Sequence, residues 1–180
     1  CRWSRDHSRR VGDLCEKIAL QIGLPEAKAS QLQLAGQLHD LGLLAIPEGL
    51  LAERGRLATE SYRSVQRHPL VAYDVLKPLQ SLRPVLPAIK HHHERINGTG
   101  YPNGLRGRQI AIEARVLAVA DAYDAMTHDR PHRPALSPLA AMQELRRCTP
   151  AGYDPVCVNA LGEILNLPAL EAHRTEASEV

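Results

Sequence analysis

The stretch His91–Pro102, HHHERINGTGYP, is the most informative motif in the chain. Three consecutive histidines run directly into a loop that contains Gly98 and Gly100 and ends at a proline. Neutral imidazole is the commonest metal ligand in proteins. Glycine and proline fix a tight backbone and leave room for a ligand to approach. The stretch therefore predicts part of a metal site with a shaped border, and the rest of the chain must supply the other ligands.

Length and composition predict a single all-α domain. The 180 residues are 44% hydrophobic and 23% charged, which is ordinary for one globular domain that buries most of its apolar surface. With no Phe and one Trp, the core must be built from Leu, Val, Ile and Ala, which suits closely packed helices. No strand-like alternation or internal repeat is present. We expect residues 1–180 to form one domain, and the start at Cys1 suggests a piece of a longer protein.

Charge and cysteine usage exclude several classes of partner and site. A net charge of +2 is too small to predict binding to a nucleic acid polymer. No apolar run reaches the roughly 18 to 20 residues of a membrane span, so no membrane contact by this domain is expected. The four cysteines are far apart, without a CxxC pair, which argues against a zinc ribbon or a disulfide scaffold. This usage is typical of a reducing cytoplasm, although a parent protein could still be membrane-attached.

The apolar spacing and the helix-breaking residues place the helices. In the first half we expect one helix over Asp6–Gly23, a second that starts at Leu24–Pro25 and has its C-cap at Gly42, and a third that has its N-cap at Thr59 and Tyr62 facing inward. A fourth helix follows His68–Pro69. Further helices are expected over Pro84–His93, Ile112–Met126 and Pro138–Arg147, and a last one starts at Asp154–Pro155.

Two of these helices carry candidate ligands near their buried faces. His7 lies four residues before Val11 and shares its face. Alone, it is more simply read as a core or capping histidine. His39 and Asp40 end the apolar stripe of the second helix. They could form a structural hydrogen-bonded pair, but a buried carboxylate needs a partner, and a metal ion is one such partner.

The second half of the chain adds further candidates. His92 and His93 lie three and four residues after Ile89, so both can face the core. Asp121 and Asp124 interrupt an otherwise apolar helix, which is costly unless both carboxylates are paired.

Two histidines have simpler readings. Taken alone, His68 is a loop histidine beside Pro69, and His91 belongs to a solvated patch.

Together these residues resemble a known family. The order His7, then His39-Asp40, then Asp121 is similar to the HD superfamily of metal-dependent phosphohydrolases. The block His92–Pro102 narrows the resemblance to the HD-GYP family, whose members hydrolyse cyclic di-GMP. The agreement extends from Asp6 to about Leu165 and includes His68-Pro69, the run DAYDAMT at 121–127 and the run RPHR at 130–133.

The resemblance implies an HD-type helical bundle with two divalent metal ions in its core. The first ion would be held by His7, His39, Asp40 and Asp121, and the second by His68, His92, His93 and a bridging Asp40. Imidazole and carboxylate ligands suit Fe or Mn, with Zn, Mg and Ni less favoured. Trp3 stands where some members have a metal-binding Glu, so two ions are expected and not three.

The resemblance also implies the chemistry. A hydroxide bridging the two ions would attack the phosphorus of cyclic di-GMP and give pGpG, with slower hydrolysis on to GMP left open. His39, Asp40 and Asp124 would take part in catalysis, Asp124 by orienting the water or a ligand histidine. Arg130 and Arg133 match positions that grip the substrate phosphate.

The glycine loop would shape the substrate site. Its expected substrate-binding residues are Asn97, Gly98, Gly100 and Tyr101. In the family this loop also contributes to contacts with signalling proteins, so the candidate partners are a GGDEF-type or other signalling protein and a second copy of the chain in a homodimer.

Two departures from the family pattern leave alternatives open. Leu43 stands where the family's HDxGK run has lysine, and Asn97 replaces the usual Asp. Loss of the lysine contact could lower the rate about tenfold to a hundredfold. The alternative is therefore a weak or inactive module that binds cyclic di-GMP or a signalling protein. A related cyclic dinucleotide is a third candidate ligand.

Overall fold

The computed structural model describes residues 2–47, 49–50, 58–129 and 134–167, and these residues form a helical domain. Its elements are α1 (Arg2–Gln21), α2 (Glu26–Leu38), η1 (Leu41–Ala45), α4 (Thr59–Val65), α5 (His68–Leu76), η2 (Gln80–Val85), α6 (Leu86–His91), η3 (Gly107–Gln109), α7 (Ile112–Thr127), α8 (Pro138–Arg147) and α9 (Pro155–Ile164). No strand occurs within this described part, which confirms the all-α prediction. None of its helices is long and apolar enough to cross a membrane.

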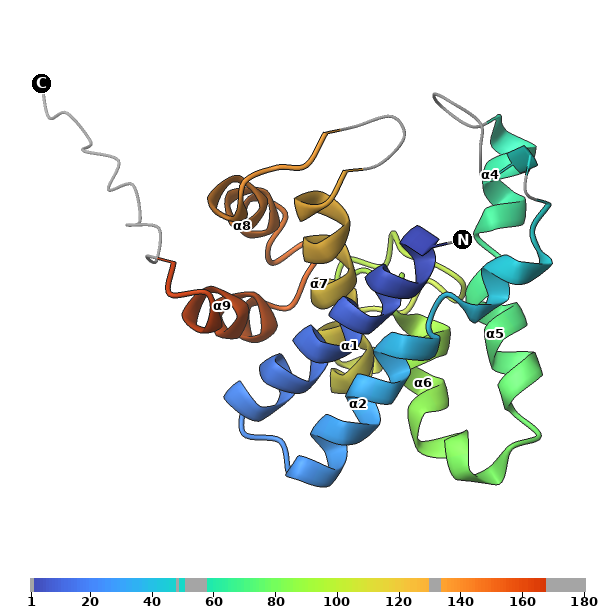
Figure 1. The fold of residues 1–180 in the computed structure, drawn as a ribbon, viewed down its shortest axis with the longest axis horizontal. Coiled ribbons are helices and arrows are strands. Elements are labelled where there is room, and N and C mark those ends of the chain that lie inside the picture. Colours follow the sequence, from blue (N-terminus) through green and yellow to red (C-terminus); the bar gives the residue numbers. More distant parts are fainter. Residues whose placement is uncertain (1, 48, 51–57, 130–133, 168–180) are drawn as a thin grey trace, which may run out of the picture.

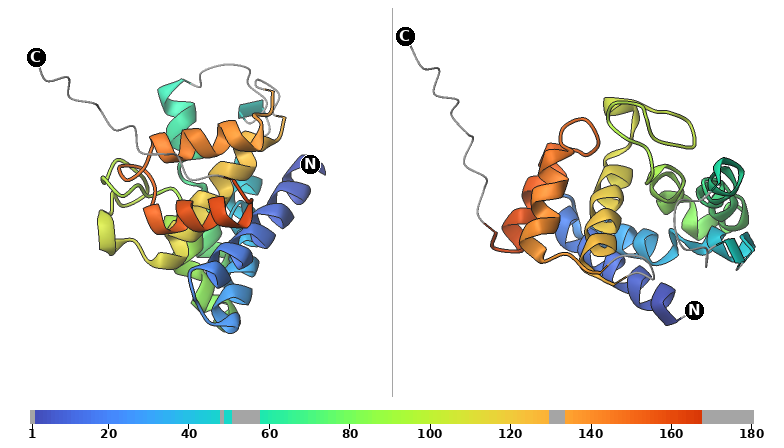
Figure 2. Two further views of the ribbon diagram at one scale, coloured as in Figure 1. Left: turned by 90° about the vertical axis from the view of Figure 1, so that its left-hand side faces the viewer. Right: turned by 90° about the horizontal axis from the view of Figure 1, so that it is seen from above.

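Helix α1 lies at the centre of the arrangement. It packs against α2 on one side and α7 on another, and α9 also contacts it (Figure 1). Helices α5 and α6 lie beside each other, and α6 also packs on α2 and α7. The turned views of Figure 2 show α8 and α9 together on the far side of α7. The chain thus gathers α1, α2, α5, α6 and α7 around one region.

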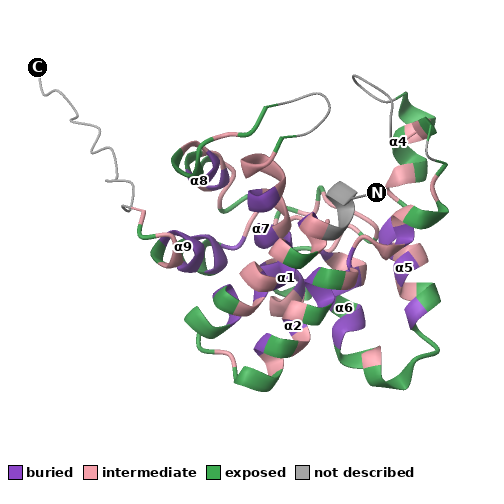
Figure 3. Ribbon diagram, in the orientation of Figure 1, coloured by how far each residue is buried: buried purple, intermediate pink, exposed green. Residues whose placement is uncertain are grey.

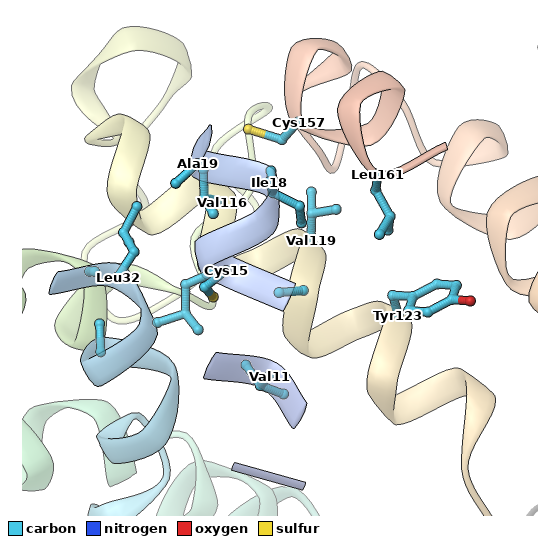
Figure 4. Packing of buried hydrophobic residues seen from close by; sticks show 14 of the residues in the cluster. Val11, Cys15, Ile18, Ala19, Leu32, Val116, Val119, Tyr123, Cys157 and Leu161 are labelled. Carbon is cyan, nitrogen blue, oxygen red and sulfur yellow. The ribbon is translucent and has the colours of Figure 1, made fainter. Parts of the chain in front are cut away.

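The core is built from aliphatic side chains, as the lack of Phe predicts. Val11, Cys15 and Ile18 of α1 are fully buried, and Figure 4 shows them beside Val116 and Val119 of α7. On α7 the apolar residues that recur at helical spacing are buried: Val116, Leu117, Val119, Ala120 and Tyr123. In Figure 3 the buried residues follow the inward faces of the helices.

Helices α1 and α2 touch backbone to backbone where they cross. A Cβ added to Gly36 would lie 2.7 Å from the backbone of Gly12, and one added to Gly12 would lie 2.7 Å from the carbonyl oxygen of Gln33. Only residues without a side chain allow so close an approach. The crossing therefore fixes the distance between the two helices, and with it the distance between His7 on α1 and His39 at the end of α2.

Two predicted helix ends are wrong. Helix α2 ends at Leu38, and Gly42 lies inside η1 and is not a C-cap. A Cβ at Gly42 would collide with the carbonyl oxygen of His68, so the glycine serves the packing of η1 on α5. Thr59 is the first residue of α4 and not its N-cap, and Tyr62, predicted to face inward, is 48% exposed.

We predict that Gly36→Val lowers the free energy of unfolding by about 2 kcal/mol or more. Valine has the better helix propensity, but its side chain would meet the backbone of Gly12, and overpacking of this kind costs about 1 to 3 kcal/mol or more. Chemical denaturation measures the effect. Ser30→Ala, on the exposed side of the same helix, is the matched control. Equal stability of Gly36→Val and the unaltered chain would contradict the close crossing.

Candidate metal centre

Seven side chains from five helical segments meet between α1, α2, α5, α6 and α7. They are His7 on α1, His39 at the C-cap of α2, Asp40 after it, His68 at the first position of α5, His92 and His93 after α6, and Asp121 on α7. His7, His39, His68 and His92 are each at most 2% exposed. All seven predicted metal ligands are therefore close together in the structure.

Three of these histidines are oriented in the same way. Nδ1 of His39, His68 and His92 each donates to the backbone carbonyl three residues earlier, at 2.7, 2.8 and 2.7 Å. A carbonyl oxygen only accepts, so the proton is on Nδ1 and the lone pair is on Nε2. None of the three Nε2 atoms has a hydrogen-bond partner within the described structure. A buried, unpaired acceptor is costly unless something else binds it.

One group of donors contains His7, His39 and Asp121. Their ligand atoms lie within 4.8 Å of one another. The distance from Nε2 of His7 to Oδ1 of Asp121 is 3.3 Å, and from Nε2 of His39 to the same oxygen it is 3.8 Å. A second group, His68, His92 and His93, meets the same 4.8 Å limit.

Asp40 lies between the two groups. Its Oδ2 is 3.4 Å from Nε2 of His39 and 3.7 Å from Nε2 of His7. Its Oδ1 faces the other way and is 3.5 Å from Nε2 of His68. One carboxylate thus presents one oxygen to each group, which is the arrangement that a bridging ligand requires.

Asp124 lies behind His7 and not between the two groups. Its Oδ2 is 2.7 Å from Nδ1 of His7, and Arg10 donates to it through Nε at 2.6 Å and Nη2 at 3.0 Å. The carboxylate is 2% exposed. Of the two roles left open for Asp124, the geometry supports orienting a ligand histidine, because the hydrogen bond at Nδ1 turns Nε2 of His7 toward Asp40 and Asp121.

The electrostatics of the metal-free site favour histidine lone pairs in the second group. Burial, followed by the nearby His93 and His39, holds the pKa of His92 well below its ordinary value. Burial also lowers the pKa of His93 to about 3. Both are therefore neutral at pH 7 and able to bind a metal.

His7 behaves differently. Burial opposes its charged form, but the hydrogen bonds to Asp121 and Asp124 outweigh this and raise its pKa to about 9. Burial alone would raise the pKa of Asp121, yet the bond with His7 and the neighbouring histidines hold it well below its usual range.

The glycine loop packs directly against the second group. The ring of Tyr101 lies 4.7 Å from that of His93, and its backbone N–H donates to the carbonyl of His93 at 3.2 Å. A Cβ at Gly100 would collide with the backbone of Glu94 and Arg95, so this position needs glycine. The loop thus forms a wall beside His93, as the sequence suggested.

Asn97 and Gly98 lie further along the loop. The side-chain oxygen of Asn97 accepts from the backbone and the hydroxyl of Thr99, at 3.0 and 2.7 Å. Gly98 has φ +80°, and an added Cβ would collide with the Arg106 side chain. Asn97 therefore keeps the turn chemistry expected of an Asp, and the role of these residues in substrate binding stays a prediction.

Sequence reasoning missed two residues that support the site. Arg10 lies three residues after His7 on the same helical face. This spacing could have indicated a cation that pairs with Asp124, the buried acid behind His7. The other is Glu94, which is 2% exposed and accepts from the backbone N–H of Asn103 at 2.7 Å and of Leu105 at 3.0 Å. Its carboxylate therefore ties the start of the loop to the backbone at Asn103 and Leu105. Nothing in the local spacing distinguishes it from a surface acid.

Three predictions fall on undescribed parts of the chain. Arg130 and Arg133 lie outside the described residues, and so does the side chain of Trp3. His91, expected to be a bystander, is half-buried, and its Nε2 lies 3.2 Å from the side-chain oxygen of Asn103. It belongs to none of the donor groups.

The donor set fits a divalent metal. Imidazole nitrogens and carboxylate oxygens converge, and the lone pairs of His39, His68 and His92 are buried and directed into the cluster.

Comparison with known proteins agrees with this reading. The HD domain family profile matches residues 1–156. A cyclic di-GMP phosphodiesterase response regulator, RpfG of Xanthomonas campestris, is 37% identical over 154 residues, which cover 84% of this chain and 41% of that protein. A 3′3′-cGAMP-specific phosphodiesterase of Vibrio cholerae is 32% identical over 165 residues, covering 92% of this chain and 36% of that protein.

The solved structures give the same fold. An HDG"Y"P protein of Bdellovibrio bacteriovorus superposes with a TM-score of 0.74 at 23% identity, covering 91% of this chain and 52% of that one. The chain spans about two fifths of the length of the two curated relatives named above. The profile match and the HHE…GYP run lead to one conclusion: the chain belongs to the HD domain family, in its HD-GYP branch.

Proposed function

We propose that this domain is a metal-dependent phosphodiesterase that opens cyclic di-GMP to linear pGpG. One observation carries the proposal: Asp40 presents one oxygen to His7 and His39 and the other to His68, so two donor groups share a carboxylate. Paired sites of this kind are typical of enzymes that hydrolyse phosphate esters.

The ligand assignment follows the two groups. His7, His39, Asp40 and Asp121 would hold one ion, and Asp40, His68, His92 and His93 the other. Such mixed imidazole and carboxylate sets suit Fe or Mn. Bound divalent ions would supply positive charge for the phosphodiester and lower the pKa of a water molecule.

The chain's own residues contribute orientation and exclusion of water. Backbone carbonyls hold the rings of His39, His68 and His92, and Asp124 holds that of His7, so that their Nε2 atoms need no rearrangement on binding. Tyr101 covers one side of His93. We expect the substrate phosphate to bind beside the two donor groups, with Arg130 and Arg133 as its predicted contacts.

The choice of cyclic di-GMP rests on the relatives. Several are named cyclic di-GMP phosphodiesterases, among them one of Pseudomonas aeruginosa that is 39% identical over 140 residues, covering 77% of this chain and 34% of that protein. Others are named 3′3′-cGAMP-specific, so this dinucleotide is the first competing substrate.

A specific observation favours a second candidate function. Leu43 is half-buried in η1, three residues after Asp40, and adds no positive charge where the family has a lysine. A domain with intact metal donors and a weakened hold on phosphate would bind the dinucleotide or a signalling protein with little turnover.

Turnover separates the two functions. Loaded anaerobically with Fe or Mn, the domain should convert cyclic di-GMP to pGpG, which ion-pair chromatography detects. Leu43→Lys should raise the rate about tenfold to a hundredfold if the missing charge acts in the transition state. Binding of cyclic di-GMP without product, with every metal and in both proteins, would leave the binding module as the function.

Metal stoichiometry tests the ligand assignment. His68→Ala and Asp121→Ala should each lose about one ion per chain, and Asp40→Ala should lose both, because its carboxylate faces both groups. Elemental analysis of the purified variants measures this. His91→Ala is the matched control, since its ring lies outside the cluster. Two ions in every variant would refute the assignment.

Arg10 should tune the site without touching an ion. Arg10→Gln removes the two donors that hold Asp124, so the orientation of His7 is lost and the affinity for one ion should fall about tenfold to a hundredfold. Competition with a chelator measures it. Arg9→Gln changes a neighbouring arginine that is 67% exposed and should have no effect. Equal affinities would show that Arg10 is not needed to hold Asp124 in place.

A further inference from the structure

A hollow lies on the outer side of α6, away from the metal donors. It lies between α5, η2 and α6 and has a volume of about 410 Å³. Figure 1 shows these three segments forming one continuous bend. The size falls within the range of about 300 to 1,000 Å³ that is usual for small-molecule sites.

Positive charge gathers around this hollow from all three segments. Lys77 follows α5, Arg83 lies in η2 and Lys90 lies in α6. Both ammonium groups lie over the ring of Tyr73, at 5.0 Å for Lys90 and 5.7 Å for Lys77. None of the three cations takes part in an ion pair within the described part of the chain, and no acidic residue lines the hollow there.

This arrangement holds like charges together without compensation. Two ammonium groups placed around one tyrosine ring repel each other, and their attraction to the ring offsets only part of the cost. An anion between Lys77, Lys90 and Arg83 would relieve the repulsion. The arginine adds a planar fork suited to phosphate oxygens. The buried Leu86 supplies an apolar side for the rest of a ligand.

We propose that this hollow binds the phosphate group of a small phosphorylated ligand. Its volume exceeds that of a phosphate group alone, and its cations come from three segments that the fold holds together. The site is separate from the metal centre, because Lys90 and His91 lie on one side of α6 while Ile89 and His92 lie on the other. The inference therefore stands or falls independently of the phosphodiesterase activity.

The lysines of this chain allow binding at the hollow to be tested residue by residue. There are four, Lys17, Lys28, Lys77 and Lys90, and only the last two line the hollow. Reductive methylation with ¹³C-formaldehyde labels each and keeps its charge. The four signals can be assigned by single Lys→Arg variants. Inorganic phosphate, pyrophosphate and AMP are then titrated into the zinc-loaded, diamagnetic chain at constant ionic strength, with sulfate as the anion control and a glutamate-rich peptide as the rival ligand.

We expect saturable shifts of the Lys77 and Lys90 methyl signals, with those of Lys17 and Lys28 unmoved. Arg83→Gln should weaken the binding of pyrophosphate about tenfold. The matched control Arg63→Gln, on α4, should leave it unchanged. Parallel shifts of all four lysines would indicate general screening and overturn the proposal. Saturation by the peptide but not by pyrophosphate, or equal affinity for sulfate, would do so as well.

Discussion

The candidate site depends on the contact between Gly12 and Gly36. Helices α1 and α2 can approach to backbone distance only because neither residue has a side chain. The approach brings Nε2 of His7 and Nε2 of His39 to the same carboxylate oxygens. A wider crossing would separate these nitrogens, and the apolar packing of α1 on α7 could not correct it. The two glycines therefore matter more to the site than their chemistry suggests.

Burial of the polar cluster destabilises the folded domain, and burial of the surrounding apolar side chains offsets this. The meeting point of five segments holds four almost fully buried histidines and two aspartates in place of an apolar core. Three of the imidazoles have a nitrogen without a hydrogen-bond partner in the described structure. Such groups destabilise a domain unless a ligand binds them, so metal and folded state should stabilise each other.

Much of this could be predicted from the sequence, for identifiable reasons. The inward residues of α7 follow a plain helical period, and His92 and His93 follow from their distance to Ile89. The role of Gly42 could not be predicted, because the glycine is needed for a close contact with His68, which is 26 positions away in the sequence. Periodicity reports which face of a helix is buried and says nothing about which backbone comes close.

The supporting residues show the same limit. Arg10 and Glu94 look like surface charges in the sequence, yet one holds Asp124 and the other ties two backbone N–H groups of the loop. Their partners are separated from them by 114 residues in one case and by 9 to 11 in the other. The spacing of Arg10 from His7 was a usable signal, whereas only the tertiary structure distinguishes Glu94 from a solvated surface acid.

The position of Asp40 has a consequence for how the site fills. Because its two oxygens face different donor groups, an ion held by one group in the proposed assignment would fix the carboxylate that the other group also needs. The first ion would then order a ligand for the second while adding positive charge beside it. Binding at the two positions would therefore be coupled, with a sign set by the balance between ordering and repulsion. A metal-poor cell would then contain a mixture of empty and fully loaded domains or a population with one ion each, depending on that sign.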